Sequence, residues 1–259
     1  MSDNGQSGAT SLPVRELEAL RAAIMFFTRL PLPSARVWDP QSLQRAAAYF
    51  PLVGWLVGAV AAGVWWAASL AFPPLVASGL SLAATLLFTG AFHEDGFADL
   101  CDGFGGGTTR ERVLEIMRDS RVGAFGAIGV AVLLLLKWHT VAALPAHLAA
   151  VALLAGHAVS RGASGTLMTT MAYAQLDGKA KPLATELRGG RLVLSLVFAL
   201  APIALLEPRL WWALVPVVVL RMLLGRWFVR RIGGYTGDCL GAAQQVCEVG
   251  FLLGVLALT

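Results

Sequence analysis

The sequence predicts an all-α, polytopic integral membrane protein with about six or seven transmembrane helices. Hydrophobic residues make up 57% of the chain and charged residues only 14%, whereas soluble domains carry about 25% charged residues. Several apolar stretches also approach or reach the length of roughly 20 residues that a helix needs to cross a bilayer. The predicted spans cover residues 49–72, 75–92, 123–144, 147–171, 192–206, 210–228 and 241–258.

The two ends of the chain are less regular than its middle. The last predicted span is interrupted by Gln244, Gln245 and Glu248 in its first half. Residues 22–33 are apolar but too few to cross a bilayer, so we expect an interfacial or re-entrant helix that ends at the nearby prolines. Residues 1–20 are expected to form a disordered or cytoplasmic tail without the features of a signal peptide. Residues 21–259 would then form a single transmembrane domain.

Basic residues in the connections predict the orientation of the spans. Lys and Arg are concentrated before the first span and in every second connection, whereas the alternate connections carry only Arg209. The positive-inside rule places the basic connections in the cytoplasm. We therefore expect a multi-pass protein of the cell inner membrane, with residues 93–121 and 233–241 facing the cytoplasm. Because this arrangement explains the net charge of +4, we expect the lipid bilayer as a partner and no nucleic acid.

Acidic residues are concentrated in residues 92–126, between two apolar stretches. If the preceding helix continues, Asp95, Asp99 and Asp102 share one stripe, because spacings of four and seven residues nearly match whole helical turns. Three adjacent carboxylates repel one another and raise each other's pKa. A hard cation such as Mg²⁺ resolves this repulsion and leaves coordination sites for substrate phosphate. The segment holds seven of the sixteen acidic residues in the chain: Glu94, Asp95, Asp99, Asp102, Glu111, Glu115 and Asp119.

A glycine run follows the acidic stripe directly. Glycine lets a backbone approach a ligand closely and direct its N–H groups toward it, and the run includes Gly105, Gly106 and Gly107. Thr108 and Glu111 have the spacing of a capping box, which predicts that a short helix begins here. The helix N-terminus, a metal and the arginines of this segment together predict a pyrophosphate site. Those arginines are Arg110, Arg112, Arg118 and Arg121.

Other polar residues leave two interpretations open. Asp238 lies in a glycine-rich connection on the same predicted face, where it either takes part in the site or belongs to an ordinary helix connection. His93 precedes the acidic stripe, and we expect it to form hydrogen bonds because Mg²⁺ prefers oxygen ligands. Ionisable residues within the spans are either functional or paired for structural reasons. They are Lys137, His139, His157, Arg161 and Arg221.

These motifs resemble the cobalamin synthase family, the adenosylcobinamide-GDP ribazoletransferases. The similarity runs over nearly the whole chain from Arg21. Its central motifs are His93-Glu94-Asp95-Gly96, Ala98-Asp99, Asp102-Gly103-Phe104 and Ile116-Met117-Arg118-Asp119-Ser120. Support comes from Thr28-Arg29-Leu30-Pro31, Pro51-Leu52-Val53-Gly54 and Thr236-Gly237-Asp238.

The resemblance implies an Mg²⁺-dependent transferase that joins adenosylcobinamide-GDP to α-ribazole or its 5′-phosphate, releasing GMP and forming adenosylcobalamin or its 5′-phosphate. Residues 93–121 would then be the active-site loop of the catalytic domain. Arg118 and Arg121 would bind phosphate oxygens, and Asp119 or Asp102 would take the proton of the attacking hydroxyl. The number of metals and a homo-oligomeric state are left open. The implied metal ligands are Glu94, Asp95, Asp99, Asp102 and Asp119.

Three alternatives fit the acidic segment less well. A CDP-alcohol phosphotransferase also uses helical aspartates for Mg²⁺, but its pattern needs an Ala-Arg pair shortly after Asp102-Gly103, which the sequence lacks. A cation transporter would place its carboxylates near the bilayer midplane on broken helices, whereas these lie in a predicted cytoplasmic connection. An ordinary solvated loop has no need for aspartates in helical phase.

Overall fold

The computed structural model describes residues 12–32, 45–174 and 187–259, and these residues form helices joined by short connections. The prediction of an all-α protein is confirmed. The longer helices are α1 (Leu12–Phe27), α3 (Phe50–Ser69), α4 (Pro74–Thr89), α5 (Phe92–Gly106), α7 (Ala124–Ala143), α8 (Ala146–Gly165), α10 (Gly190–Leu200), α11 (Leu214–Ile232) and α12 (Gly237–Ala257). The shorter ones are η1 (Ala47–Tyr49), α6 (Arg110–Ile116), α9 (Leu167–Thr170), η3 (Ala201–Leu205) and η4 (Pro208–Ala213).

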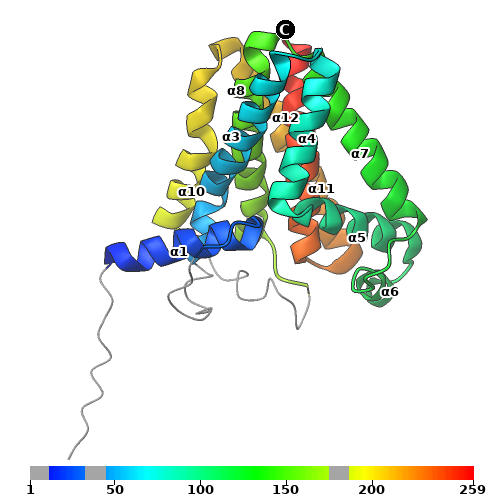
Figure 1. Ribbon diagram of the computed structural model, residues 1–259. Helices are drawn as coiled ribbons and strands as arrows, with labels where there is room; N and C mark the ends of the chain where they lie inside the picture. Colours follow the sequence, from blue (N-terminus) through cyan, green and yellow to red (C-terminus); the bar gives the residue numbers. More distant parts are fainter. Residues whose placement is uncertain (1–11, 33–44, 175–186) are drawn as a thin grey trace, which may run out of the picture.

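The helices form a membrane-spanning bundle, in which α3, α4, α7, α8, α10, α11 and α12 run along its length (Figure 1). Among the described residues, four helical segments are long and apolar enough to cross a bilayer, or five if α4 and α5 count as one bent span. They are Ala47–Ser69, Ala124–Ala143, Pro208–Ile232 and Gly237–Ala257. This agrees with the predicted polytopic membrane protein, although fewer helices are both long and apolar enough to span a bilayer than the six or seven expected.

Two of the expected spans differ from this pattern for identifiable reasons. Helix α8 occupies much of the expected span 147–171, but it is buried on most of its surface and carries His157 and Arg161. Because its neighbours are protein rather than lipid, it does not need to be apolar on every face. The apolar segment Gly190–Leu205, at the expected span 192–206, is shorter than the spanning helices.

The chain changes direction sharply between α4 and α5. Helix α4 ends at Thr89, and the next two residues have left-handed backbones, with φ of 67° at Gly90 and 54° at Ala91. Glycine adopts this conformation without steric cost and commonly ends helices. The axes of α4 and α5 therefore differ by 89°, and α5 lies across the base of the bundle at the level of α1 (Figure 1). The segment predicted as a loop begins, in fact, with this helix.

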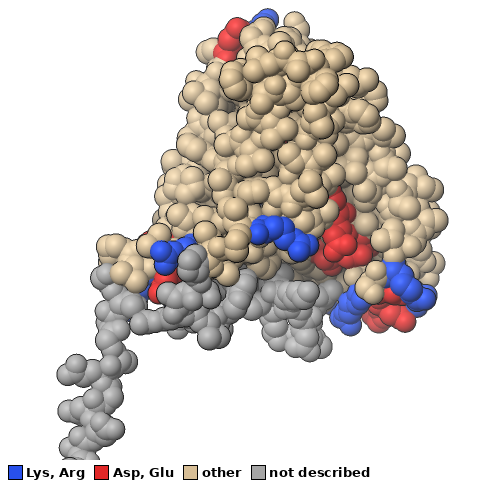
Figure 2. Space-filling view, viewed as in Figure 1, with Lys and Arg blue, Asp and Glu red and all other residues tan. Residues whose placement is uncertain are grey.

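Charged side chains gather at the end of the bundle formed by α1, α5 and α6 (Figure 2). Between this end and the opposite one, the visible surface carries neither Lys or Arg nor Asp or Glu (Figure 2). Large apolar side chains are exposed on the spans, including Leu87, Ile128 and Val218. An apolar belt between polar ends is the surface expected of a bundle that crosses a bilayer.

Helix α1 begins earlier than the predicted interfacial helix at residues 22–33 and ends at Phe27, before the prolines. It lies across the base of the bundle (Figure 1), which agrees with an interfacial position. The Tyr49 hydroxyl donates to Glu16 at 2.8 Å, and Arg191 donates to the same carboxylate at 2.8 Å. These contacts join α1 to η1 and α10. Of the predicted tail, residues 1–11 lie outside the described ranges.

Candidate active site

A cavity of about 380 Å³ lies where α1, α3, α5, α8 and α12 meet. Three carboxylates line it: Asp95 and Asp99 on α5, and Asp238 in the first turn of α12. Two arginines line it as well, Arg118 after α6 and Arg161 on α8. Its remaining wall includes a group of aromatic side chains, namely Phe26, Phe27, Phe50, Phe92 and Tyr173.

Close packing of α5 against α12 brings the three carboxylates to one cavity. A Cβ atom at Gly96 would lie only 3.0 Å from the Asp238 Cα, and one at Gly241 would lie 3.2 Å from the His93 carbonyl oxygen. The start of α12 is fixed by Thr236, whose hydroxyl accepts from the Cys239 N–H at 3.2 Å. Small residues at the crossing thus determine how near Asp238 comes to α5.

The cavity carboxylates repel one another. Burial raises the pKa of Asp99 to about 7, and the charges of Asp238, Asp95 and Asp102 contribute to the same shift. A carboxyl group in such a position is stabilised by taking up a proton or by binding a cation. The part of the expected stripe formed by Asp95 and Asp99 is therefore present and faces the cavity.

Asp102, the third member of the expected stripe, has a different role. It does not line the cavity; its two carboxylate oxygens accept from the backbone N–H groups of Gly123 at 2.7 Å and Gly126 at 2.8 Å. These N–H groups belong to the N-terminus of α7, where a negative charge is favourable. The structure thus gives no support to Asp102 as the proton acceptor, and we assign it to helix capping.

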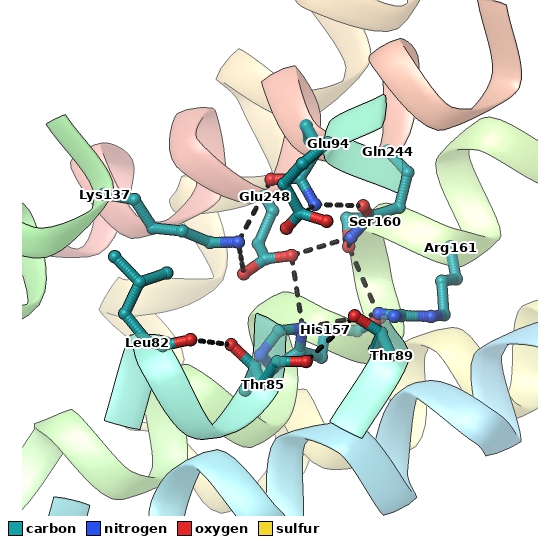
Figure 3. Close-up of polar contacts among 11 residues, drawn as sticks. Leu82, Thr85, Thr89, Glu94, Lys137, His157, Ser160, Arg161, Gln244 and Glu248 are labelled. Carbon is teal, nitrogen blue, oxygen red and sulfur yellow. Dashed lines mark hydrogen bonds and ion pairs between the residues drawn. The ribbon is translucent and has the colours of Figure 1, made fainter. Parts of the chain in front are cut away.

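Glu94 also points away from the cavity residues, into the interior of the bundle. It is 7% exposed, and its Oε1 accepts from Gln245 Nε2 at 2.8 Å, whereas its buried Oε2 has no hydrogen-bond partner among the described residues. It belongs to the polar cluster drawn in Figure 3. The adjacent His93 stacks on the Phe27 ring, with centroids 5.0 Å apart. Burial, with a contribution from Arg161, lowers the pKa of His93 well below its ordinary value.

The glycine run serves helix packing rather than ligand approach. Gly105 and Gly106 are the last residues of α5, and none of Gly105, Gly106 and Gly107 lines the cavity. A Cβ atom at Gly105 would lie 2.6 Å from the Phe125 ring, and one at Gly107 would lie 2.6 Å from Val113. The Gly107 carbonyl accepts from Arg231 at 2.7 Å. These glycines therefore let α6 and α7 approach the end of α5.

Asp119, a predicted metal ligand or base, and Arg121, a predicted phosphate ligand, lie outside the cavity. Arg121 donates to both Asp119 oxygens, the shortest contact being 2.6 Å, and both side chains are exposed. The hydrogen bond from Arg121 lowers the pKa of Asp119 to about 2, which makes it a poor proton acceptor at neutral pH. Arg118, by contrast, lines the cavity, and its binding of phosphate stays a prediction. The helix after the glycines is capped by Thr109, one residue later than expected, and Arg112 N–H donates to it at 3.3 Å.

Sequence reasoning did not assign several cavity residues. Arg161 was marked only as an ionisable residue within a span, and Ser164 and Gln244 were not assigned to the site. The available signal was helical spacing: Arg161, Ser164, Gly165 and Met168 lie on one face of the end of α8 and its extension, and all four line the cavity. The aromatic wall could not be foreseen, because it combines α1, α3 and α5.

The cavity suits a metal that is shared with a substrate. Within the described ranges, no three His, Cys, Asp or Glu side chains converge closely enough to hold a metal ion. Mg²⁺ at phosphate-transfer sites is usually bound by one or two carboxylates together with substrate phosphates and waters. Asp95 and Asp99, which occupy one helix face and repel each other, provide such a partial set of hard oxygen donors.

Comparison with known proteins indicates one family over most of the chain. The model of the family described as "Cobalamin-5-phosphate synthase" matches residues 19–256. The protein named adenosylcobinamide-GDP ribazoletransferase from Ralstonia pickettii (strain 12J) is 50% identical over 244 residues, which cover 93% of this chain and 95% of that protein. The protein of the same name from Shewanella frigidimarina (strain NCIMB 400) is 43% identical, with 95% and 96% covered. No solved structure matches the chain.

Proposed function

The chain belongs to the cobalamin-5-phosphate synthase family and is a membrane transferase that joins adenosylcobinamide-GDP to α-ribazole or its 5′-phosphate, and we propose that it does so in the cavity between α5, α8 and α12. One observation carries this proposal: Asp95, Asp99 and Asp238 face the same cavity as Arg118 and Arg161. Acidic groups for a cation and arginines for phosphate are two of the requirements of a site that transfers a phosphate group.

The proposed metal is Mg²⁺, and Asp95 and Asp99 would hold it. When bound, it would neutralise charge on the pyrophosphate of the nucleotide substrate. The pKa of Asp99 is raised by burial first and by the neighbouring carboxylates second, and a bound cation would favour the charged form against both effects. Glu94, Asp102 and Asp119 are left out of the ligand set, since each is directed elsewhere in the structure.

Arg118 and the start of α12 would bind and orient phosphate oxygens. Arg118 and Gly237 line the cavity, and Gly237 is the first residue of α12. The N-terminus of a helix favours an anion because its first N–H groups have no partner within the helix. Arginine adds a charged, directional donor. The pyrophosphate would thus lie between the carboxylates of α5 and these donors.

Asp238 would orient the attacking hydroxyl of α-ribazole and take its proton. It replaces Asp102 and Asp119 in this role, because it faces the cavity from the helix opposite Asp95 and Asp99. The new bond would form between this hydroxyl oxygen and the phosphorus nearest cobinamide, and the bond to the GMP oxygen would break. A base at this position must lie within hydrogen-bonding reach of the hydroxyl.

The proposed location is the cell inner membrane, with the cavity accessible from the cytoplasm. The distribution of Lys and Arg over the connections supports this orientation. The bundle end that carries α1, α5 and α6 is also the end where charged side chains gather (Figure 2). A cytoplasmic opening would give access to nucleotide substrates without transport.

The proposal is tested with the full chain purified in detergent and supplied with adenosylcobinamide-GDP and α-ribazole 5′-phosphate. GMP release is measured with Mg²⁺, with EDTA, and with Mg²⁺ restored. We expect release only when Mg²⁺ is present, and a loss of about 10²–10⁴-fold in Asp238→Asn if Asp238 is the base. GMP release that continues in EDTA would show that the reaction does not need Mg²⁺. Wild-type GMP release by Asp238→Asn would show that Asp238 is not the base.

A further inference from the structure

A cluster of polar side chains lies inside the bundle behind the cavity (Figure 3). Glu248 of α12 is 1% exposed; it pairs with Lys137 of α7 at 2.8 Å and with His157 of α8 at 3.1 Å. Gln244 donates to the Glu248 Oε2 at 2.7 Å and to Ser160 at 2.9 Å. Within this cluster, Lys137 and Glu248 form the direct ion pair, and Glu94 is a second buried carboxylate.

Arg161 is the exception in this cluster. It is 3% exposed, and in the described part of the chain it forms no ion pair with a carboxylate. Its Nη1 donates to the His157 carbonyl at 3.0 Å and lies 3.3 Å from His157 Nδ1. Its buried Nε has no hydrogen-bond partner in residues 12–32, 45–174 and 187–259. The charges of Glu248 and Glu94 act on Arg161 without a direct contact. A buried guanidinium has several donors to satisfy, and leaving a buried donor without a partner is costly.

The open side of Arg161 is the cavity, whose wall it forms together with Ser164 of α8 and Gln244 of α12. The acidic groups that face the same space, Asp95, Asp99 and Asp238, are the ones assigned above to the metal and to the acceptor hydroxyl. Among the described residues Arg161 makes direct polar contacts only with His157, so an anion in the cavity would supply a direct charged partner that Glu248 and Glu94 do not. Arginine is suited to this role because it stays charged and offers several donors in one plane.

We propose that Arg161 binds a phosphate group of the substrates at the inner end of the cavity. This inference rests on the function proposed above and adds a second phosphate contact to Arg118. The substrates offer two sources of phosphate, the 5′-phosphate of α-ribazole phosphate and the pyrophosphate of adenosylcobinamide-GDP. The Phe27 and Phe50 rings in the same wall would place the aromatic base of α-ribazole near Arg161, which favours the first source.

The test compares Arg161→Gln and Arg161→Lys with wild type in the GMP-release assay, using either α-ribazole or α-ribazole 5′-phosphate as the acceptor. A matched control is Arg221→Gln. Arg221 is a partly buried arginine of α11 that donates to Thr166 and Thr170 and does not line the cavity. We expect Arg221→Gln to retain wild-type kinetic constants for both acceptors.

If Arg161 binds the acceptor phosphate, Arg161→Gln raises KM for α-ribazole 5′-phosphate by about ten- to a hundredfold, the effect of losing a hydrogen bond to a charged group, and leaves KM for α-ribazole unchanged. If Arg161 binds the pyrophosphate, GMP release falls equally with both acceptors, and KM for adenosylcobinamide-GDP rises. Arg161→Lys keeps the positive charge, so its KM should rise less than that of Arg161→Gln in either case. Unchanged constants in Arg161→Gln would overturn the inference, whereas an inactive wild type would overturn the proposed function.

A binding measurement makes the result independent of turnover and guards against a misfolded variant. Inorganic pyrophosphate with Mg²⁺ should raise the unfolding temperature of wild type and of Arg221→Gln in detergent. If Arg161 contacts the pyrophosphate, this shift should be smaller in Arg161→Gln. If Arg161 instead contacts the acceptor phosphate, the shift caused by inorganic phosphate should be smaller in Arg161→Gln. Equal shifts in wild type and Arg161→Gln with both anions would contradict a phosphate contact. If Arg161→Gln does not fold, Arg161→Lys is judged by the same criteria.

Discussion

Asp102 accepts a hydrogen bond from the backbone N–H of Gly126 at 2.8 Å. The contact joins the end of α5 to the start of α7 and uses a carboxylate that the sequence motif would place at the metal. A Cβ atom at Gly126 would lie 2.4 Å from the Asp102 Oδ2, so a side chain there would displace this carboxylate. The same motif thus contains one aspartate for structure and two that face the cavity.

We expect Asp102→Asn to destabilise the protein by about 1–3 kcal/mol, because one acceptor oxygen becomes an NH₂ group and leaves a buried backbone N–H unsatisfied. Denaturant unfolding in detergent, with Asp119→Asn as the exposed control, measures this effect. An Asp102→Asn variant of wild-type stability that has lost Mg²⁺-dependent turnover would instead return Asp102 to the metal site.

The buried Lys137–Glu248 pair should be required for folding. Lys137→Met leaves Glu248 without its closest cation, and removal of one partner of a buried ion pair typically costs about 3–5 kcal/mol. Adding Glu248→Gln to Lys137→Met should recover part of that loss. Unfolding temperatures of the two single variants and the double variant measure the coupling. Arg209→Gln, which breaks the exposed pair with Glu207, serves as the control and should change the unfolding temperature little. A loss in the double variant equal to the sum of the losses in the two single variants would contradict direct pairing.

Gly96→Ala should reduce activity, because its methyl group would lie 3.0 Å from the Asp238 Cα and 3.3 Å from the Asp238 carbonyl oxygen. These are backbone atoms of α12, so relief requires the two helices to separate and Asp238 to move. We expect a loss of stability of about 1–3 kcal/mol together with lower kcat. The control is Gly63→Ala, where a Cβ atom would meet no atom within 4 Å. Equal behaviour of the two variants would show that the α5–α12 spacing is not critical.

The contacts of Glu16 should make the docking of α1 depend on pH. Burial raises the pKa of Glu16, but hydrogen bonds from Tyr49 and Arg191 outweigh it, so the pKa in the folded state lies below the ordinary value of 4.5. The stabilisation is therefore present above pH 4.5 and is lost as the pH falls through the lower, folded-state value. Hydrogen exchange of α1 measured from pH 6 downward should show this loss in wild type, whereas Glu16→Gln should show a flatter profile. An identical pH dependence in both proteins would contradict the assignment.

The sequence predicted the membrane fold and the shared helix face of Asp95 and Asp99, because both depend on local patterns. Apolar length and composition identify spans such as α3 and α7, and four-residue spacing places Asp95 and Asp99 on one helix face. The break at Gly90 and Ala91 was not predicted, since a single glycine at a helix end does not specify a turn of 89°. Helix α8 resembles a span by length but is enclosed by other helices, which the one-dimensional pattern does not show.

The roles of individual acidic residues could not be separated from the sequence. Asp102 shares the helical phase of Asp99, but its oxygens are taken by the N-terminus of α7, which lies 21 residues later in the chain. Asp119 is adjacent to Arg118, yet only Arg118 lines the cavity, because the turn after α6 directs Asp119 toward Arg121. Arg161 and Gln244 join the site through the packing of α8 against α12, a contact that no local motif encodes.

The most direct test of the central claim is GMP release by Asp99→Asn and Asp119→Asn, measured side by side with wild type under saturating Mg²⁺. Both aspartates belong to the same acidic segment, but only Asp99 faces the cavity. The account predicts that Asp99→Asn loses turnover while remaining folded, and that Asp119→Asn retains it. The reverse pattern, with an active Asp99→Asn and an inactive, folded Asp119→Asn, would contradict the cavity as the active site.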